Sequence, residues 1–169
     1  VREAFAALER EGLLVLSPHR EVRVVSFSPA YRQDARRLRS LLEGYALYRG
    51  MRRRPAEAGA RLSELAGRFA ALLSTALIAE TIESVLEDAW RLDAEFHTAI
   101  IDLARDELLQ QIWKTRSIII WLPTTPPTFS RLDVARAYLE SQVERHRRIV
   151  ETVEAGDALL AAQALTAHV

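Results

Sequence analysis

Three of the four histidines of this chain stand where one metal ion could bind them together. His97 follows Asp93 by one helical turn, so these two side chains share one face of a helix. His146 lies ten residues before Gly156, and His168 lies eleven residues after Asp157. One aspartate and three histidines make a plausible ligand set for a divalent metal. The first question is whether such a metal would catalyse a reaction or hold a ligand that the protein senses.

The spacing around the Gly-Asp break predicts that the last two histidines meet. At about 1.5 Å per residue, each lies roughly 15–16 Å from the turn. If the two flanking helices form an antiparallel hairpin, both imidazoles return to the same level. Each residue also has a simpler interpretation. Asp93 and His97 can form an ordinary pair, His146 lies in the charged run 144–148, and His168 is next to the chain end. Taken together, the four positions favour one shared site.

Composition narrows the class of protein. The chain has 169 residues, of which 49% are hydrophobic and 27% charged, as in soluble globular proteins. It has no apolar run long enough to span a bilayer and no signal peptide, so no membrane partner is expected. The absence of cysteine excludes disulfides and thiolate metal sites, and it fits a reducing, cytoplasmic location. The net charge of zero gives no sign of nucleic-acid binding from bulk charge alone.

The elements that must position these residues begin with a helix and a hairpin. Residues 1–10 carry a helical apolar stripe that ends before Gly12. Residues 13–16 and 22–27 have the composition of strands, and residues 17–20 between them have that of a turn. A helix followed by a small hairpin is similar to the second half of a winged helix-turn-helix.

From Ser28 onward the sequence predicts helices only. Ser28 is the expected N-cap and Pro29 the first helical residue. The helices are predicted over 30–50, 55–74, 75–104, 107–121, 130–155 and 157–169, with a proline-rich loop at 123–127. The inner face of the first is predicted to carry Leu38, Leu41, Leu42, Tyr45 and Ala46. Trp90, Phe96 and Ile100 indicate that the third is largely buried. We therefore expect an all-α antiparallel bundle over 29–169, preceded by a partial winged helix-turn-helix over 1–28.

These residues resemble a known family. Val1-Arg2-Glu3-Ala4 and Leu8-Glu9-Arg10-Glu11-Gly12-Leu13 resemble the recognition helix and the start of the wing in GntR-family transcription regulators. Four further segments resemble the ligand-binding FCD domain of the FadR subgroup: 93–97, 145–150, 155–157 and 167–168. Residues 38–44 are similar to the first helix of that domain. Six helices after the wing resemble the shorter, VanR-like form.

The resemblance implies a homodimeric regulator, expected to be a repressor, that binds operator DNA under the control of an effector. It implies that Asp93, His97, His146 and His168 bind a divalent metal, with zinc first and nickel or manganese as alternatives. It further implies a small carboxylate metabolite as the effector, bound beside the metal. Because the match begins near the recognition helix, the DNA-binding domain is expected to lack its first part.

The DNA-binding candidates lie on the predicted recognition helix and wing. Arg2 is the first choice for a base or phosphate contact, because a guanidinium binds guanine or phosphate in a bidentate way. His19 and Arg20 at the tip of the wing come second. Each of the three also has a simpler interpretation as a solvated surface cation.

The effector candidates are Arg39 and Arg116. Arg39 lies in a helix that should face the pocket and could bind a carboxylate that the metal leaves free. The alternative is a salt bridge with Glu43, which the i, i+4 spacing slightly favours. Arg116 has no independent support.

Two other functions stay open at this point. A helical-bundle metalloenzyme, a hydrolase or lyase, would need a general base near the metal. Glu95 and Glu144 are the neighbours in sequence, and Glu95 should point away from Asp93 and His97. A metal could also be purely structural. We expect no enzyme, because a helix-and-hairpin segment precedes the ligand set.

Overall fold

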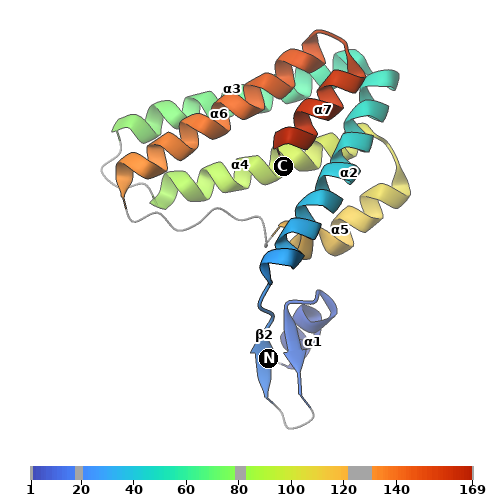
Figure 1. Ribbon diagram of the computed structural model, residues 1–169, viewed down its shortest axis with the longest axis vertical. Coiled ribbons are helices and arrows are strands. Elements are labelled where there is room, and N and C mark those ends of the chain that lie inside the picture. The colour runs from blue at the N-terminus through green and yellow to red at the C-terminus, as the bar shows by residue number, and fades with distance from the viewer. Residues whose placement is uncertain (1, 18–20, 79–82, 122–130, 169) are drawn as a thin grey trace.

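The computed structural model describes residues 2–17, 21–78, 83–121 and 131–168, with the side chains of 77–78, 83–85 and 115–121 left aside. Figure 1 shows a small lobe below a larger helical bundle. The lobe contains α1 (Arg2–Arg10), β1 (Leu14–Leu16) and β2 (Val22–Val24). The bundle contains α2 (Pro29–Arg53), α3 (Pro55–Ile78), α4 (Glu83–Leu103), α5 (Glu107–Trp121), α6 (Leu132–Glu154) and α7 (Ala158–His168). The predicted fold class, a helical bundle preceded by a helix and a hairpin, is confirmed.

The lobe has almost no core of its own. Helix α1 ends at Arg10, and Gly12 beyond it has a φ of 78°, the left-handed conformation expected after a helix. The strands are antiparallel and pair Leu14 with Val24. Both strands are shorter than predicted. Beyond β2, Phe27 stacks on Tyr31 of α2 instead of extending the ladder. Helix α1 fully buries none of its residues: Ala4 and Phe5 of its apolar stripe are exposed, and Leu8 is half-buried.

Helix α2 connects the lobe to the bundle. Ser28 caps it by accepting a hydrogen bond from Tyr31 N at 3.1 Å, and Pro29 occupies the first turn, as predicted. The helix extends past the expected end near Gly50 to Arg53, and it stops there because Pro55 disfavours helical backbone at Arg54. Because β2 ends at Val24 and α2 begins at Pro29, the link between the hairpin and the bundle is only a few residues long.

The predicted inner face of α2 is wrong in three positions. Leu38, Leu41 and Tyr45 are exposed, Leu41 to 71%. The buried face lies on the other side of the helix and consists of Ala35, Arg39, Ser40, Glu43, Gly44, Ala46, Leu47, Gly50 and Met51. This face is rich in small residues because α2 packs closely on α4 and α7. A Cβ added at Gly50 would lie 2.7 Å from Leu103 Cβ.

The predicted break at residues 74–75 is also wrong. Ser74 and Thr75 both lie inside α3, where their hydroxyls donate to the carbonyls of Ala70 and Ala71 one turn earlier. Such back-bonding lets polar residues continue a helix. Trp90 of α4 is 43% exposed, contrary to the expectation that it lies in the core.

Two tight turns fix the positions of the last helices. Between α4 and α5, Arg105 has a left-handed φ of 46°, and Asp106 caps α5 by accepting from Leu109 N at 3.0 Å. Between α6 and α7, Gly156 has φ 78°, and Asp157 accepts from the amides of Leu159 and Leu160. The predicted Gly-Asp break is thus confirmed, and it makes α6 and α7 an antiparallel hairpin (Figure 1).

The core lies where the six helices of the bundle meet. Helix α3 packs on α4 and α6, and α2 packs on α4 and α7. The largest fully buried apolar side chains are Leu47, Leu62, Leu65, Phe69, Phe96, Ile100, Ile101, Ile149 and Leu165. A smaller cluster at the far end of α3 and α6 contains Ala76, Ala89, Ala135 and Leu139. In the described part of the chain, no helix is long and apolar enough to cross a membrane.

Candidate metal centre

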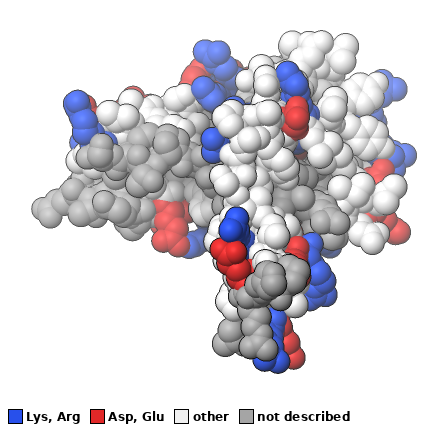
Figure 2. Space-filling model, turned by 60° about the horizontal axis from the view of Figure 1, so that its bottom comes forward, with Lys and Arg blue, Asp and Glu red and all other residues white. Residues whose placement is uncertain are grey.

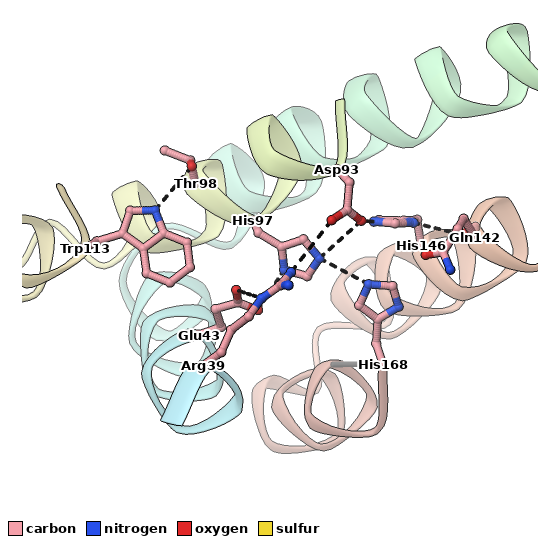
Figure 3. Close-up of polar contacts among 9 residues, drawn as sticks. All are labelled: Arg39, Glu43, Asp93, His97, Thr98, Trp113, Gln142, His146 and His168. Atoms are coloured by element: carbon pink, nitrogen blue, oxygen red, sulfur yellow. Dashed lines mark hydrogen bonds and ion pairs between the residues drawn. The ribbon is translucent and has the colours of Figure 1, made fainter. Parts of the chain in front are cut away.

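Asp93, His97, His146 and His168 meet inside the bundle. Asp93 and His97 come from α4, His146 from α6 and His168 from α7 (Figure 3). One ligand atom of each lies within 4.8 Å of the others. The rings of His146 and His168 lie 4.6 Å apart, at the common level that the spacing around the turn predicts.

The imidazole of His97 is fixed by a carboxylate from another helix. Its Nδ1 lies 2.7 Å from Glu43 Oε2, and both side chains are fully buried. A carboxylate paired with an arginine, as Glu43 is with Arg39 at 2.7 Å, only accepts hydrogen bonds. The proton of a neutral His97 ring must therefore be on Nδ1. Its Nε2 then presents a lone pair toward Asp93 Oδ1 at 3.7 Å and His168 Nε2 at 3.1 Å.

His146 is oriented in the same sense by its own helix. Its Nδ1 lies 2.7 Å from the carbonyl oxygen of Gln142, which can only accept. Its Nε2 faces Asp93 Oδ1 at 3.2 Å and has no hydrogen-bond partner. The ring stacks on Phe69 with centroids 4.2 Å apart and meets the edge of Phe96 at 4.6 Å. Phe69 and Phe96 thus fix the orientation of the His146 ring.

His168 closes the group from the last turn of α7. Its ring is stacked on His97 with centroids 5.0 Å apart. Burial, followed by the charges of His97 and His146, lowers the pKa of His168 to about 2, so the ring is neutral at ordinary pH. Its buried Nδ1 has no partner. A neutral ring with an unsatisfied buried nitrogen needs an explanation.

Both carboxylates beside these rings are ionised. Burial raises the pKa of Asp93, but His97, His146 and Arg39 together outweigh burial and leave that pKa well below its usual range. Burial likewise raises the pKa of Glu43, and Arg39 and His97 reverse the effect, so that pKa is lowered as well. Burial, followed by the charge of Arg39, lowers the pKa of His97. Counting only the two carboxylates and the guanidinium of Arg39, the group carries one net negative charge.

This arrangement fits a divalent cation. Nε2 of His97 and Nε2 of His146 both face Asp93 Oδ1, at 3.7 and 3.2 Å. An unprotonated ring nitrogen this close to a carboxylate oxygen is unfavourable unless a cation or a proton lies between them. Three imidazole nitrogens and one carboxylate oxygen form a donor set that suits zinc and related divalent metals. The remaining negative charge is complementary to such an ion.

Glu43 is the residue of this centre that the sequence reading assigned only to a salt bridge. Glu43 follows Arg39 by four residues, a spacing that is common in exposed ion pairs on helices. The pair by itself therefore does not indicate that Glu43 is buried. The signal was present in the face it shares with Ala46, Leu47 and Gly50, whose small and apolar residues follow helical spacing toward the core.

The predicted effector residues have different outcomes. Arg39 is buried, forms the expected salt bridge with Glu43, and places Nη2 3.8 Å from Asp93 Oδ2. It therefore lies at the centre, while its contact with an effector stays a prediction. Arg116 belongs to α5, but its side chain lies outside the described residues.

The predicted DNA-binding residues belong to the lobe. Arg2 is exposed at the start of α1, and His19 and Arg20 lie outside the described residues. Figure 2 shows this lobe projecting toward the viewer, with basic and acidic side chains mixed at its tip. Their roles toward DNA stay predictions.

The two glutamates considered as a general base lie away from the centre. Glu95 pairs with Arg61 at 2.9 Å and Arg68 at 2.8 Å, toward α3. Glu144 pairs with Arg147 and Arg148, both at 2.8 Å, on the solvent side of α6. Neither is placed to activate a water molecule beside Asp93.

Comparisons with known proteins agree with this architecture. Residues 34–169 match the FCD domain family. The chain is 31% identical over 176 residues to the "Probable D-xylose utilization operon transcriptional repressor" of Paenarthrobacter nicotinovorans, an alignment that covers 100% of this chain and 68% of that protein. The solved structure of E. coli McbR/YncC superposes with a TM-score of 0.71 at 17% identity, covering 99% of this chain and 74% of that one. At this identity the superposition supports the fold alone.

Proposed function

Because this chain belongs to the FCD family of GntR-type transcription regulators, we propose that it senses a small organic acid through a bound divalent metal and regulates operator binding in response. Membership of this family makes it a regulator rather than an enzyme. The positions of Glu95 and Glu144, both paired with arginines away from the centre, agree with that assignment.

The observation that carries the proposed metal site is the group of four ligand atoms within 4.8 Å of one another. Asp93, His97, His146 and His168 would hold the ion. The unpartnered Nε2 of His146, which faces Asp93 at 3.2 Å, supports a site that needs a further group to satisfy it. Zinc suits the donor set best, with nickel or manganese as alternatives.

A metal held by four protein groups, when it accepts six ligands, offers two further positions to a carboxylate. This makes a small organic acid the proposed effector class. Arg39 is the buried cation beside the centre, and we propose that it contributes to binding of the anion. Arg116 of α5 is the second proposed contact.

The lobe is the proposed DNA-binding part, with the boundary to the sensing domain at residues 28–29. Helix α1 and the hairpin have the order of a recognition helix and a wing. Arg2 at the exposed start of α1, together with His19 and Arg20, would contact DNA. The short link to α2, whose Glu43 and Arg39 reach the centre, offers a direct path from effector to lobe.

The proposed homodimer has a suitable surface on α2. Leu38, Leu41, Tyr45 and Tyr48 are all exposed and follow one another at intervals of three, four and three residues, which is the spacing of a coiled-coil seam. Leu108 and Ile112 of the neighbouring α5 are exposed as well. A monomer seldom leaves so many large apolar side chains uncovered on adjacent helices. A second copy of the same chain is the proposed partner, since two such seams are self-complementary.

The function is tested by footprinting the native protein on the DNA upstream of its own gene. The footprint is measured with zinc, with a chelator, and with a panel of mono- and dicarboxylates. We expect a protected operator whose affinity changes with at least one carboxylate, and only when zinc is present. The proposal would be contradicted if the protein protected no DNA, or if no carboxylate changed its affinity for the operator.

A further inference from the structure

We propose that Glu43 is the positioning residue of the metal centre: it orients His97 for coordination and, by holding Arg39, keeps that cation away from Asp93. The inference rests on the proposed metal binding and adds two residues of α2 to the four proposed ligands. Neither Glu43 nor Arg39 would bind the metal. They would decide whether the ligands are available to it.

The first role concerns the side of the His97 ring that carries the proton. A neutral imidazole can coordinate only through its unprotonated nitrogen. Glu43 Oε2 lies 2.7 Å from Nδ1 and belongs to another helix, so it fixes both the ring's orientation and its tautomer. Carboxylates in this position orient metal-binding histidines in many proteins, and their removal typically weakens metal binding about 10- to 100-fold.

The second role concerns Arg39, which stays charged even when buried. Its Nε lies 2.7 Å from Glu43 Oε1, whereas its Nη2 lies 3.8 Å from Asp93 Oδ2. If Glu43 lost its charge, the guanidinium would still face the carboxylate of Asp93. A buried charge is strongly driven to pair. Arg39 would then compete with the metal for Asp93.

The substitution Glu43→Gln separates the proposed roles from simple space filling. The position faces two donors, Arg39 Nε and His97 Nδ1, and a carboxylate offers an acceptor to each. Glutamine has the same shape but offers one acceptor and one donor. In one orientation the amide N–H of glutamine would face the N–H of Arg39, donor against donor. In the other orientation the amide would donate to His97 Nδ1, which would move the ring's proton to Nε2 and block coordination.

The tautomer is read directly in the metal-free protein by ¹⁵N NMR of the histidine rings. We expect wild-type His97 to carry its proton on Nδ1, and Glu43→Gln to populate the Nε2 form. A wild-type ring protonated on Nε2, or on both nitrogens, would overturn the inference. This measurement needs no metal, so its outcome does not depend on whether the proposed metal site is real.

Zinc affinity is then measured by competition with a chromophoric chelator. We expect Glu43→Gln to bind zinc about 10- to 100-fold more weakly than wild type, and Glu43→Gln/Arg39→Met to recover part of that loss because the competing cation is gone. Glu95→Gln, on α4 but paired toward α3, is the control and should leave zinc affinity unchanged.

Equal zinc affinity for wild type and Glu43→Gln would overturn the positioning role. A double variant no tighter than Glu43→Gln would overturn the role of Arg39. A wild type without zinc affinity would instead contradict the proposed function.

Discussion

His146 Nε2 lies 3.2 Å from Asp93 Oδ1, while Nδ1 of the same ring is committed to the carbonyl of Gln142 at 2.7 Å. A neutral ring in this position turns a lone pair toward a carboxylate oxygen. Two acceptors facing each other inside a protein are unfavourable unless a cation or a proton lies between them. This pair therefore supports a metal site more strongly than the presence of histidines alone.

Removing the metal should lower stability. A ligand present at a hundred times its dissociation constant stabilises the folded state by about 2.7 kcal/mol. In a chain of this size each kcal/mol corresponds to about 2–4 °C in Tm. We expect the chelator-treated protein to melt about 5–10 °C below the zinc-loaded protein in a calorimetric scan, with refilling restoring the difference.

The same preparations separate a sensing metal from a purely structural one. If the metal holds the effector, a carboxylate that binds the zinc-loaded protein in calorimetric titration should lose measurable binding to the metal-free protein. Unchanged carboxylate affinity after metal removal, together with the lowered Tm, would establish a structural metal and reject the sensing role.

The close contact of α2 with α4 predicts opposite effects for two glycine substitutions. Gly50→Ala would place a methyl group 2.7 Å from Leu103 Cβ, and overpacking of this kind costs about 1–3 kcal/mol. Gly67→Ala, in α3, meets nothing within 4 Å and should gain about 0.5–1 kcal/mol from its helix propensity. Urea unfolding of both variants tests the pair. A Gly50→Ala variant as stable as Gly67→Ala would show that the helices do not approach this closely.

Local sequence signals predicted the boundaries that depend on capping. Ser28-Pro29 begins α2 and Gly156-Asp157 separates α6 from α7, because each pair has a specific backbone requirement that neighbouring residues do not alter. The same turn, with nearly equal spacing on both sides, was enough to predict that His146 and His168 lie at one level. These signals are local, and they do not depend on the rest of the fold.

Hydrophobicity alone predicted the wrong face of α2. Leu38, Leu41 and Tyr45 are apolar but point outward, and Arg39 and Glu43 are charged but buried. A pattern cannot distinguish a face covered by the core from one covered by another molecule, since both are apolar. The burial of Glu43 is likewise decided by His97, 54 residues away in the sequence. Such long-range pairing has no local signature.

The exposed seam on α2 predicts the effect of a charge on assembly. Leu41→Glu places a carboxylate at the most exposed leucine of the seam, where a dimer would bury it. We expect the variant to be a monomer, and we expect no loss of fold stability within each chain, because Leu41 is exposed in the single chain. Light scattering after gel filtration measures the mass. Val134→Glu is the matched control, because Val134 is an exposed apolar residue of α6 outside the seam. A Leu41→Glu variant that stays dimeric, or a wild type that is monomeric, would contradict the proposed interface.

The central claim is that Asp93, His97, His146 and His168 hold one metal ion, and the most direct test is the metal content of purified protein. Elemental analysis by mass spectrometry would compare wild type, His146→Ala and Glu144→Ala, the last altering an exposed residue of the same helix. We predict about one divalent ion per chain in wild type and in Glu144→Ala, and its loss in His146→Ala. Full retention of metal by His146→Ala, or a wild type that cannot be loaded, would contradict the account.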